Sequence, residues 1–316
     1  MAQVTILQLN IWMSGTKVPD GIARCADIVR TTHADVVITS ESTPQAVEEL
    51  RHLLGDGWYA ASDPARNGAL ARWPVAKVGR SDDYLATHVA HPGRTLAVYS
   101  MHLEYEYYTP FLYRGYGGST RYLPSGRWGW GPMPSPVLDE DDLKRVNVES
   151  RRPAVGATVA AMMRADTTAG RAPVAGGDFN EPSHLDYTID AMYAFDHMGV
   201  TRVWETTKAF ADKGLADTFR QAHPDPLTHP GVTWPVAVPG HDPGALSWAP
   251  LADVRDRIDF IFHDPAATTL LSAQLVGPSQ SVCRTARVDE TDSPDYLTLP
   301  TPWPTDHRGN LVHLSV

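Results

Sequence analysis

The chain has 316 residues, 42% of them hydrophobic, and contains 9 tryptophans, 12 tyrosines and 7 phenylalanines. This content is ample for a substantial core and excludes an intrinsically disordered chain or a small stapled scaffold. The net charge of −10 is a poor match to a protein that grips duplex nucleic acid through a broad basic face, although a local basic groove or a bound metal can offset it.

The chain shows no sign of a boundary between domains. No Ser/Gly-rich or highly charged linker divides it, so we expect one domain over residues 1–316. Its two cysteines, Cys25 and Cys283, lie far apart and form no disulfide framework. The N-terminus has no leader pattern, and no apolar run reaches membrane-spanning length. We therefore expect a soluble cytoplasmic protein, or a secreted one if a leader was removed, without stable membrane association; the sequence leaves the oligomeric state open.

The first hundred residues alternate between apolar runs and helical stripes. Residues 4–12 predict a strand that ends near Asn10, and residues 19–32 have apolar side chains at helical spacing. Residues 35–41 predict a second buried strand ending at Glu41, and Thr43 caps a helix that runs to Leu54. Further strands are expected over residues 58–61, 69–78, 84–89 and 95–102, the last ending at His102.

Residues 104–137 interrupt this pattern with a segment rich in aromatic residues, glycine and proline. Half of the 12 tyrosines lie in it. Loops of this length inside a compact domain are usually functional or mobile. We therefore expect a long irregular insertion that starts from the strand ending at His102.

The second half of the chain returns to regular elements. Residues 139–142 crowd four acids at the expected start of a helix, which Pro153 interrupts before a second apolar stripe. Residues 172–178 predict a buried strand that ends at Asp178, and Asn180 points the same way because alternate side chains of an extended chain share a face. A simple turn is the alternative, since Gly, Asp, Asn and Pro all form turns. Later strands are expected over residues 257–262, 269–276 and 311–316.

Six strand ends each carry polar residues that a core would not need: Asn10, Glu41, His102, the Asp178/Asn180 pair, Asp259, and the Asp306/His307 pair. Glu41 alone can be a solvated strand end, and His102 a hydrogen-bonded core histidine. Asp259 can be an ion-pair partner of Arg255 or Arg257. The repetition argues against six independent accidents.

These polar residue types are suited to metal binding and proton transfer. Carboxylates are hard ligands suited to Mg²⁺ or Mn²⁺, and no Cys/His spacing suggests zinc. A histidine beside an aspartate suits proton transfer or stabilisation of a charged oxygen. Attack of water on phosphorus needs metal charge, an activated water and donors to the non-bridging oxygens. This set of residues can provide all three.

Six short motifs occur in the order seen in the endonuclease/exonuclease/phosphatase (DNase I-like) superfamily: Leu9-Asn10, Ser40-Glu41, Ser100-Met101-His102, Gly177-Asp178-Phe179-Asn180, Arg257-Ile258-Asp259-Phe260 and Thr305-Asp306-His307. The sequence resembles that superfamily from residue 4 to residue 316. The resemblance implies an α/β fold, a four-layer sandwich in which two mostly antiparallel β-sheets pack face to face with helices on the outside. Ser40 and Thr305 depart from the family pattern, where many members have Gln and Ser.

The resemblance also implies a role for each residue. The residues that would hold or adjoin a divalent cation, Mg²⁺ or Mn²⁺, are Asn10, Glu41 and Asp306. Asp178 would orient or deprotonate the attacking water, and Asn180 would hold the phosphate or the leaving oxygen. His102 would donate to a phosphate oxygen. His307, oriented by Asp259, would contact the phosphate or transfer a proton.

The resemblance sets the reaction class but leaves the substrate open, because specificity lies in loops. We expect the insertion to contact the substrate, with four candidate residues: Tyr105, Arg114, Arg121 and Trp128. Aromatic rings stack on a base or a sugar, and arginines pair with a phosphate or carboxylate. The alternatives are that the rings only pack the loop onto the body, or that residues 128–130 dip into a membrane surface.

These expectations lead to three hypotheses for the function. The first is a divalent-metal-dependent phosphodiesterase or phosphatase acting on a small organic phosphate or a nucleotide-like molecule. The second is a DNase I-type nuclease, which the acidic composition and the lack of Lys/Arg clusters disfavour. The third is a catalytically inactive binding module on the same fold, which the presence of the whole residue set disfavours.

Overall fold

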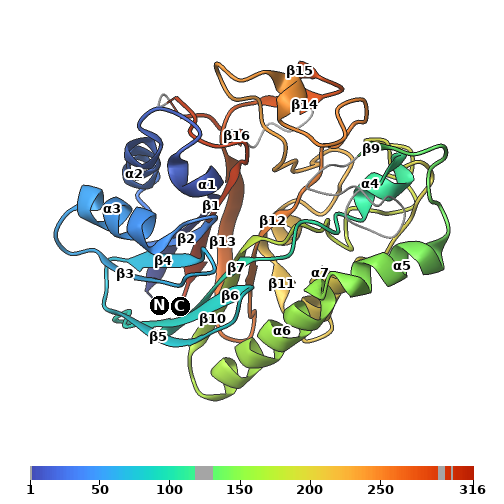
Figure 1. The fold of residues 1–316 in the computed structure, drawn as a ribbon. Coiled ribbons are helices and arrows are strands. Elements are labelled where there is room, and N and C mark those ends of the chain that lie inside the picture. The colour runs from blue at the N-terminus through green and yellow to red at the C-terminus, as the bar shows by residue number, and fades with distance from the viewer. Residues whose placement is uncertain (1, 118–130, 291–295, 300–301) are drawn as a thin grey trace.

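The structure is a computed structural model that describes residues 2–117, 131–290, 296–299 and 302–316. Two β-sheets pack face to face at its centre, and helices cover both outer faces (Figure 1). The expected four-layer α/β sandwich is therefore confirmed. The candidate substrate residues Arg121 and Trp128 lie outside the described residues.

The first sheet has seven strands within the described residues. Its order is β16 (Tyr296–Leu297), β13 (Thr269–Val276), β17 (Gly309–Ser315), β1 (Gln3–Asn10), β2 (Val36–Ser40), β4 (Gly68–Ala71) and β3 (Tyr59–Ser62). The β1/β2 and β13/β16 pairs are parallel and the others antiparallel. Helices α2 (Gly21–Thr31) and α3 (Pro44–Leu54) pack on its outer face (Figure 1).

The second sheet has six strands in the part of the chain that is described. Its order is β11 (Ala216–Asp217), β12 (Asp259–His263), β10 (Ala172–Asp178), β7 (Leu96–His102), β6 (Tyr84–Val89) and β5 (Val75–Arg80). Only the β7/β10 pair is parallel among the pairings of this sheet. Helices α6 (Arg152–Thr168) and α7 (Glu205–Ala211) cover its outer face (Figure 1).

The remaining elements lie around this sandwich. They are α1 (Trp12–Gly15), α4 (Pro110–Tyr113), β8 (Tyr116–Gly117), β9 (Gly131–Pro132), α5 (Glu140–Glu149), α8 (Thr218–Ala222), the short 3₁₀ helix η1 (Pro243–Ala245), β14 (Gln280–Cys283) and β15 (Ala286–Asp289). Within the described residues, the expected insertion thus contains only the short elements α4, β8 and β9. None of the described helices is both long and apolar enough to cross a bilayer.

The structure places the residues expected at helix ends where the sequence predicts them. Thr43 caps α3, where its side chain accepts a hydrogen bond from the Ala46 N–H, and Asp139 caps α5 in the same way through the Asp142 N–H. Pro153 lies in the first turn of α6, where a missing N–H costs nothing, so it separates α5 from α6 as expected.

One expected strand is wrong. Residues 69–78 do not form a single strand but split into β4 and β5, which belong to different sheets. Pro74 lies between them, and a proline cannot donate to a β ladder. The chain therefore crosses from one sheet to the other at this point.

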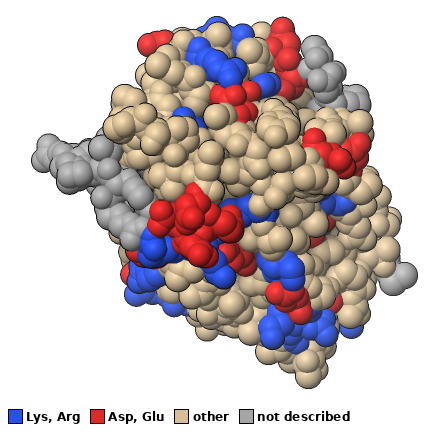
Figure 2. All heavy atoms as spheres, turned by 90° about the vertical axis from the view of Figure 1, so that its right-hand side faces the viewer, with Lys and Arg blue, Asp and Glu red and all other residues tan. Residues whose placement is uncertain are grey.

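The surface charge is mixed on the face that Figure 2 shows. Basic and acidic side chains lie close together there, and the described residues form no continuous basic area. The first turn of α5 contributes three acids, Glu140, Asp141 and Asp142. The mixed charge on this face accompanies a net charge of −10 for the chain.

Candidate active site

The candidate site is the polar end of the core between the two sheets. Successive side chains of a strand alternate between its faces. In β1, Val4 and Ile6 lie in the inter-sheet core, so Gln8 and Asn10 continue the same face. In β10, Ala172 and Val174 lie in that core, and Asp178 continues their face.

The other strands repeat this change from apolar to polar. The inter-sheet face of β2 ends at Ser40, that of β7 ends at His102, and that of β12 begins at Asp259. Strand register then sets the neighbours, because Asp178 pairs with His102 in β7 and with Asp259 in β12. The polar ends of these strands therefore meet at one edge of the sandwich.

Gly177 allows this convergence. Its φ of +149° is one that L side chains rarely adopt, and a Cβ there would lie 1.8 Å from the Met101 carbonyl oxygen. The backbones of β10 and β7 thus approach each other directly before Asp178.

Asn10 links three of the expected site residues. Its Nδ2 donates to Asp178 Oδ2 at 3.0 Å and to Glu41 Oε1 at 3.2 Å, and it lies 3.4 Å from His307 Nε2. Its Oδ1 accepts from the Trp12 N–H at 2.9 Å. The amide is therefore fixed by its own hydrogen bonds, and it holds two carboxylates in one cluster beside the imidazole.

His307 is oriented from behind by Asp259. His307 Nδ1 and Asp259 Oδ2 are 2.8 Å apart, so Nε2 faces Asp178 Oδ2 at 3.8 Å. The other oxygen of Asp259 accepts from Gln8 Nε2 at 2.9 Å, and Gln8 Oε1 accepts from Asn310 Nδ2 at 2.8 Å. This hydrogen-bonded row of buried groups fixes the imidazole ring.

Gln8 and Asn310 were not predicted from the sequence. Both lie close to a predicted site residue, Gln8 two residues before Asn10 in β1 and Asn310 three residues after His307 in β17. The alternation of side chains along a strand could have identified them, because it places both on the inter-sheet face, where a polar residue needs a partner. Asp259 is also not an ion-pair partner of Arg255 or Arg257, because these arginines pair with Asp253 and Asp186 respectively.

The environment of His307 favours a positive charge on its imidazole and negative charges on the neighbouring carboxylates. Burial opposes protonation of His307, but the carboxylates of Asp259 and Asp178 outweigh it and raise its pKa to about 10. Burial and the charge of Asp259 raise the pKa of Asp178 to about 6, although His307 acts in the other direction. At neutral pH the imidazole is therefore a cation and a hydrogen-bond donor, while Asp178 is ionised and able to accept a proton.

Glu41 is held by an unusual turn. Trp12, Met13, Ser14 and Gly15 all have positive φ angles, and Glu41 itself has φ of 55°. The Met13 N–H donates to Glu41 Oε2 at 2.6 Å, and the Ser14 N–H donates to the Glu41 carbonyl oxygen at 2.8 Å. Burial opposes ionisation of Glu41, but the charges of His102 and His307 and the Met13 N–H lower its pKa. Left-handed non-glycine residues cluster at functional sites, and here they hold an ionised carboxylate in place.

Asn180 is fixed at the opposite side of the cluster. Its N–H donates to Asp178 Oδ1 at 2.9 Å and its Nδ2 donates to the Leu103 carbonyl oxygen at 3.0 Å. The Ser40 hydroxyl accepts from the Asp178 N–H at 3.1 Å and donates to the Met101 carbonyl oxygen at 2.8 Å. Ser40, which departs from the family pattern, therefore joins the two sheets directly beneath the site.

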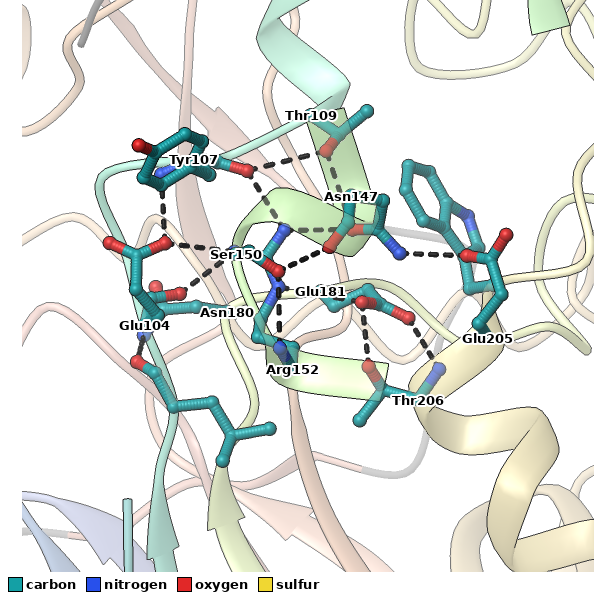
Figure 3. Close-up of polar contacts among 12 residues, drawn as sticks. Glu104, Tyr107, Thr109, Asn147, Ser150, Arg152, Asn180, Glu181, Glu205 and Thr206 are labelled. Atoms are coloured by element: carbon teal, nitrogen blue, oxygen red, sulfur yellow. Dashed lines mark hydrogen bonds and ion pairs between the residues drawn. The ribbon is translucent and has the colours of Figure 1, made fainter. Parts of the chain in front are cut away.

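A buried network supports the segment that follows His102 (Figure 3). The Arg152 guanidinium has no exposed surface and donates to the carbonyl oxygens of Glu104 and Tyr107, both at 2.8 Å. Arg152 also donates to Asn147 Oδ1 at 2.9 Å and pairs with Glu181, whose side chain is fully buried. Together with the Asn180 contact to Leu103, these bonds fix the backbone of residues 103–107 beside the cluster.

Comparison with known proteins adds to this geometry. Residues 7–307 match the Endonuclease/Exonuclease/phosphatase family. The chain belongs to this family.

Relatives of this family member are distant in sequence. An uncharacterized protein of Caenorhabditis elegans, F14F9.5, is 24% identical over 270 residues, which are 82% of this chain and 78% of that protein. Its name states no activity, so the match adds none.

Solved structures match the family member over almost its whole length. D. rerio TDP2 complexed with single strand DNA product has a TM-score of 0.52 at 15% identity, with 100% of both chains covered. The mannosyl-6-phosphatase Bt3783 of Bacteroides thetaiotaomicron has a TM-score of 0.52 at 14% identity, covering 99% of this chain and 100% of the other. The 3' phosphatase NExo from Neisseria has a TM-score of 0.51 at 16% identity, with 99% and 100% covered. At this identity the matches establish the fold and leave the substrate undetermined.

The residues of this family member fit a divalent cation. Ligand atoms of Glu41, Asp178 and His307 lie within 4.8 Å of one another. The buried Asp306 Oδ1 has no hydrogen-bond partner among the described residues, while its Oδ2 accepts from Trp234 Nε1 at 3.2 Å. Burial raises the pKa of Asp306 to about 6, so a cation would favour its charged form. Carboxylate oxygens are the ligands that Mg²⁺ and Mn²⁺ prefer, whereas a protonated His307 offers no lone pair.

A cleft of about 520 Å³ lies above the cluster. Its lining includes all of the following predicted residues: Glu41, His102, Tyr105, Asp178, Asn180, Asp306 and His307. Asn10 and Asp259 lie directly behind this lining, in hydrogen bonds to Asp178 and His307. The structure therefore brings together every catalytic and metal-binding residue predicted from the sequence.

The predicted substrate role of Arg114 does not fit the structure. Its guanidinium has no exposed surface and forms two hydrogen bonds to Asp256, at 2.6 and 3.0 Å. Arg114 is not part of the cleft lining, and burial leaves it no access to a ligand. It instead fixes the insertion to the body of the protein, which is the packing role considered for that segment. Arg66, an arginine that was not predicted, does line the cleft.

Proposed function

We propose that this protein is a divalent-metal-dependent phosphoesterase that hydrolyses a phosphodiester or phosphomonoester bond of a small organic or nucleotide-like phosphate. The observation that carries the proposal is the cluster of Glu41, Asp178 and His307 at the floor of a cleft. These three groups come from distant parts of the chain, and each is held by further hydrogen bonds.

The geometry supports a distinct role for each group. Glu41, ionised and held by the Met13 N–H, would hold Mg²⁺ or Mn²⁺ together with Asp306, with Asn10 beside them. The cation would supply positive charge that stabilises the developing charge on phosphate oxygens. Asp178 would orient the attacking water and accept its proton.

The imidazoles and Asn180 would act on the phosphate. His307, kept protonated by Asp259, would donate to a phosphate oxygen. His102 and Asn180 line the same cleft and would bind further phosphate or leaving-group oxygens. This division provides a base, Asp178, and donors for the phosphate around the same cleft.

A panel assay tests the proposal. The protein with Mg²⁺ is expected to hydrolyse at least one substrate among 4-nitrophenyl phosphate, bis(4-nitrophenyl) phosphate and small alkyl phosphoesters, and EDTA is expected to abolish the activity. Glu41→Gln should abolish it too, whereas Glu49→Gln, an exposed change on α3, should not. Equal activity of wild type and Glu41→Gln would contradict the proposal. Nicking of a supercoiled plasmid faster than hydrolysis of every small ester would favour the nuclease alternative.

Metal binding is expected to weaken in acid. Because Asp178 and Asp306 both have pKa values raised to about 6, they take up protons as the pH falls through that value and lose the charge that attracts a cation. Calorimetric titration with Mn²⁺ should give an affinity at about pH 5 that is lower by about tenfold or more than at about pH 7.5. An affinity that stays constant over this interval would show that Asp306 does not bind the ion and that the charge of Asp178 does not attract it.

A further inference from the structure

The cleft above the reactive cluster is mostly hydrophobic. Apart from the polar cluster, six aromatic residues contribute to its lining: Trp12, Tyr105, Tyr108, Phe111, Trp234 and Trp248. Met13, Ala245, Leu246 and Ile258 add aliphatic or thioether surface. A small-molecule site of this kind binds its ligand mainly through contact with apolar surface.

Two of these aromatic residues have no spare donor for a ligand, because their polar atoms are already engaged. The Tyr108 hydroxyl donates to Asp256 Oδ2 at 2.6 Å, and Trp234 Nε1 donates to Asp306 Oδ2 at 3.2 Å. Phe111, Leu246 and Ile258 have no polar side-chain atom. These residues therefore present ring faces and carbon surface to a ligand. A sugar hydroxyl or a second phosphate would lose its hydrogen bonds to water against this surface and gain none in return.

The lining is also poor in positive charge. Arg66 is the one arginine or lysine among the described lining residues, it is exposed, and its Nη1 lies 3.6 Å from Met13 Sδ. Recognition of several phosphates normally uses a group of arginines or lysines. The cleft therefore suits one phosphate at the cluster and an uncharged group next to it.

The aromatic wall extends outward to the rim. The Tyr105 ring is parallel to the His102 ring, with centroids 6.5 Å apart, and meets the Trp248 ring edge to face at 6.1 Å. Trp248 is 40% exposed, so a large apolar surface faces solvent at the mouth of the cleft. An uncharged ring packed against these residues would cover that surface.

We propose that this cleft is a subsite for a hydrophobic group, a phenyl-like ring attached through its oxygen or carbon to the phosphorus, with Trp248 and Tyr105 as its specificity-determining residues. The inference rests on the proposed phosphoesterase function for the placement of the phosphorus at the cluster. Sugar phosphates and polyphosphates are therefore not expected to be the preferred ligands.

Binding of phosphonates tests the subsite without requiring turnover. In the presence of Mg²⁺, calorimetry is expected to show benzylphosphonate binding about tenfold or more tightly than methylphosphonate, because the phenyl ring leaves water. Glucose 6-phosphate should bind more weakly than benzylphosphonate. Equal affinity for the benzyl and methyl compounds, or tighter binding of the sugar phosphate, would overturn the inference.

A pair of variants locates the subsite. Trp248→Ala should remove most of the tenfold benzyl preference, whereas Leu251→Ala, which removes a 73% exposed residue from the same loop outside the cleft, should retain it. A benzyl preference unchanged in Trp248→Ala would contradict the assignment. Because the proposed function is judged by hydrolysis, a preserved benzyl preference with no hydrolysis of any ester would refute that function and leave the subsite in place.

Discussion

Replacement of Asp178 by asparagine is expected to lower the rate of phosphoester hydrolysis by about 1000-fold. Asp178 has a pKa of about 6, which leaves it ionised but basic at neutral pH. An asparagine keeps the size of the side chain and one acceptor for the Asn10 amide, but it cannot take a proton from water. Steady-state kinetics with the best substrate of the panel, with Mg²⁺ in excess, measure the loss.

The comparison needs a folded variant and a matched control. Circular dichroism of Asp178→Asn should match the wild type, since the fold of β10 depends on its ladder and its apolar face. Asp190→Asn makes the same chemical change at an exposed position and should keep full activity. If Asp178→Asn retained more than about a tenth of the wild-type rate, Asp178 would not be the group that handles the proton.

Removal of the Arg152 side chain is expected to have the largest effect on stability. Arg152→Met would leave Glu181 as a buried carboxylate without its cation and would free the carbonyl oxygens of Glu104 and Tyr107 (Figure 3). Breaking one side of a buried ion pair typically costs about 3–5 kcal/mol. Urea unfolding of wild type and variant measures the difference in the free energy of unfolding.

A double variant separates the lost charge pair from the lost packing. Arg152→Met combined with Glu181→Met should recover part of the stability, because the uncompensated carboxylate is gone. Arg151→Met, a change at the neighbouring exposed position, should cost less than about 1 kcal/mol. If Arg152→Met were as mild as this control, the network would not be what fixes residues 103–107.

Strand periodicity explains why so much of the site could be predicted. The polar residues at the ends of β1, β7 and β10 stand out because the first half of each strand places only apolar residues on the same face. Once the order of motifs indicates two packed sheets, these ends must meet at one edge. The role of Gln8 follows the same rule, yet a single glutamine inside a strand gives no signal until its partner Asp259, 251 residues away in sequence, is known.

Pairings between distant residues explain what could not be predicted. Arg114 lies in an aromatic insertion, where arginines are typical of ligand contact. Its partner Asp256 is 142 residues away, and only the fold brings the two together in the interior. The turn at residues 12–15 is similarly hidden, because Trp12 and Met13 are not residues that normally adopt positive φ angles.

The cation site is the central claim, and diffraction from crystals soaked in Mn²⁺ tests it most directly. Anomalous scattering at the manganese edge is expected to place an ion beside the Glu41 carboxylate, with Asp306 among its neighbours, and to show no such peak in Glu41→Gln crystals. A manganese peak at another place in the protein, or an undiminished peak beside residue 41 in the variant, would contradict a metal-dependent phosphoesterase built on these carboxylates.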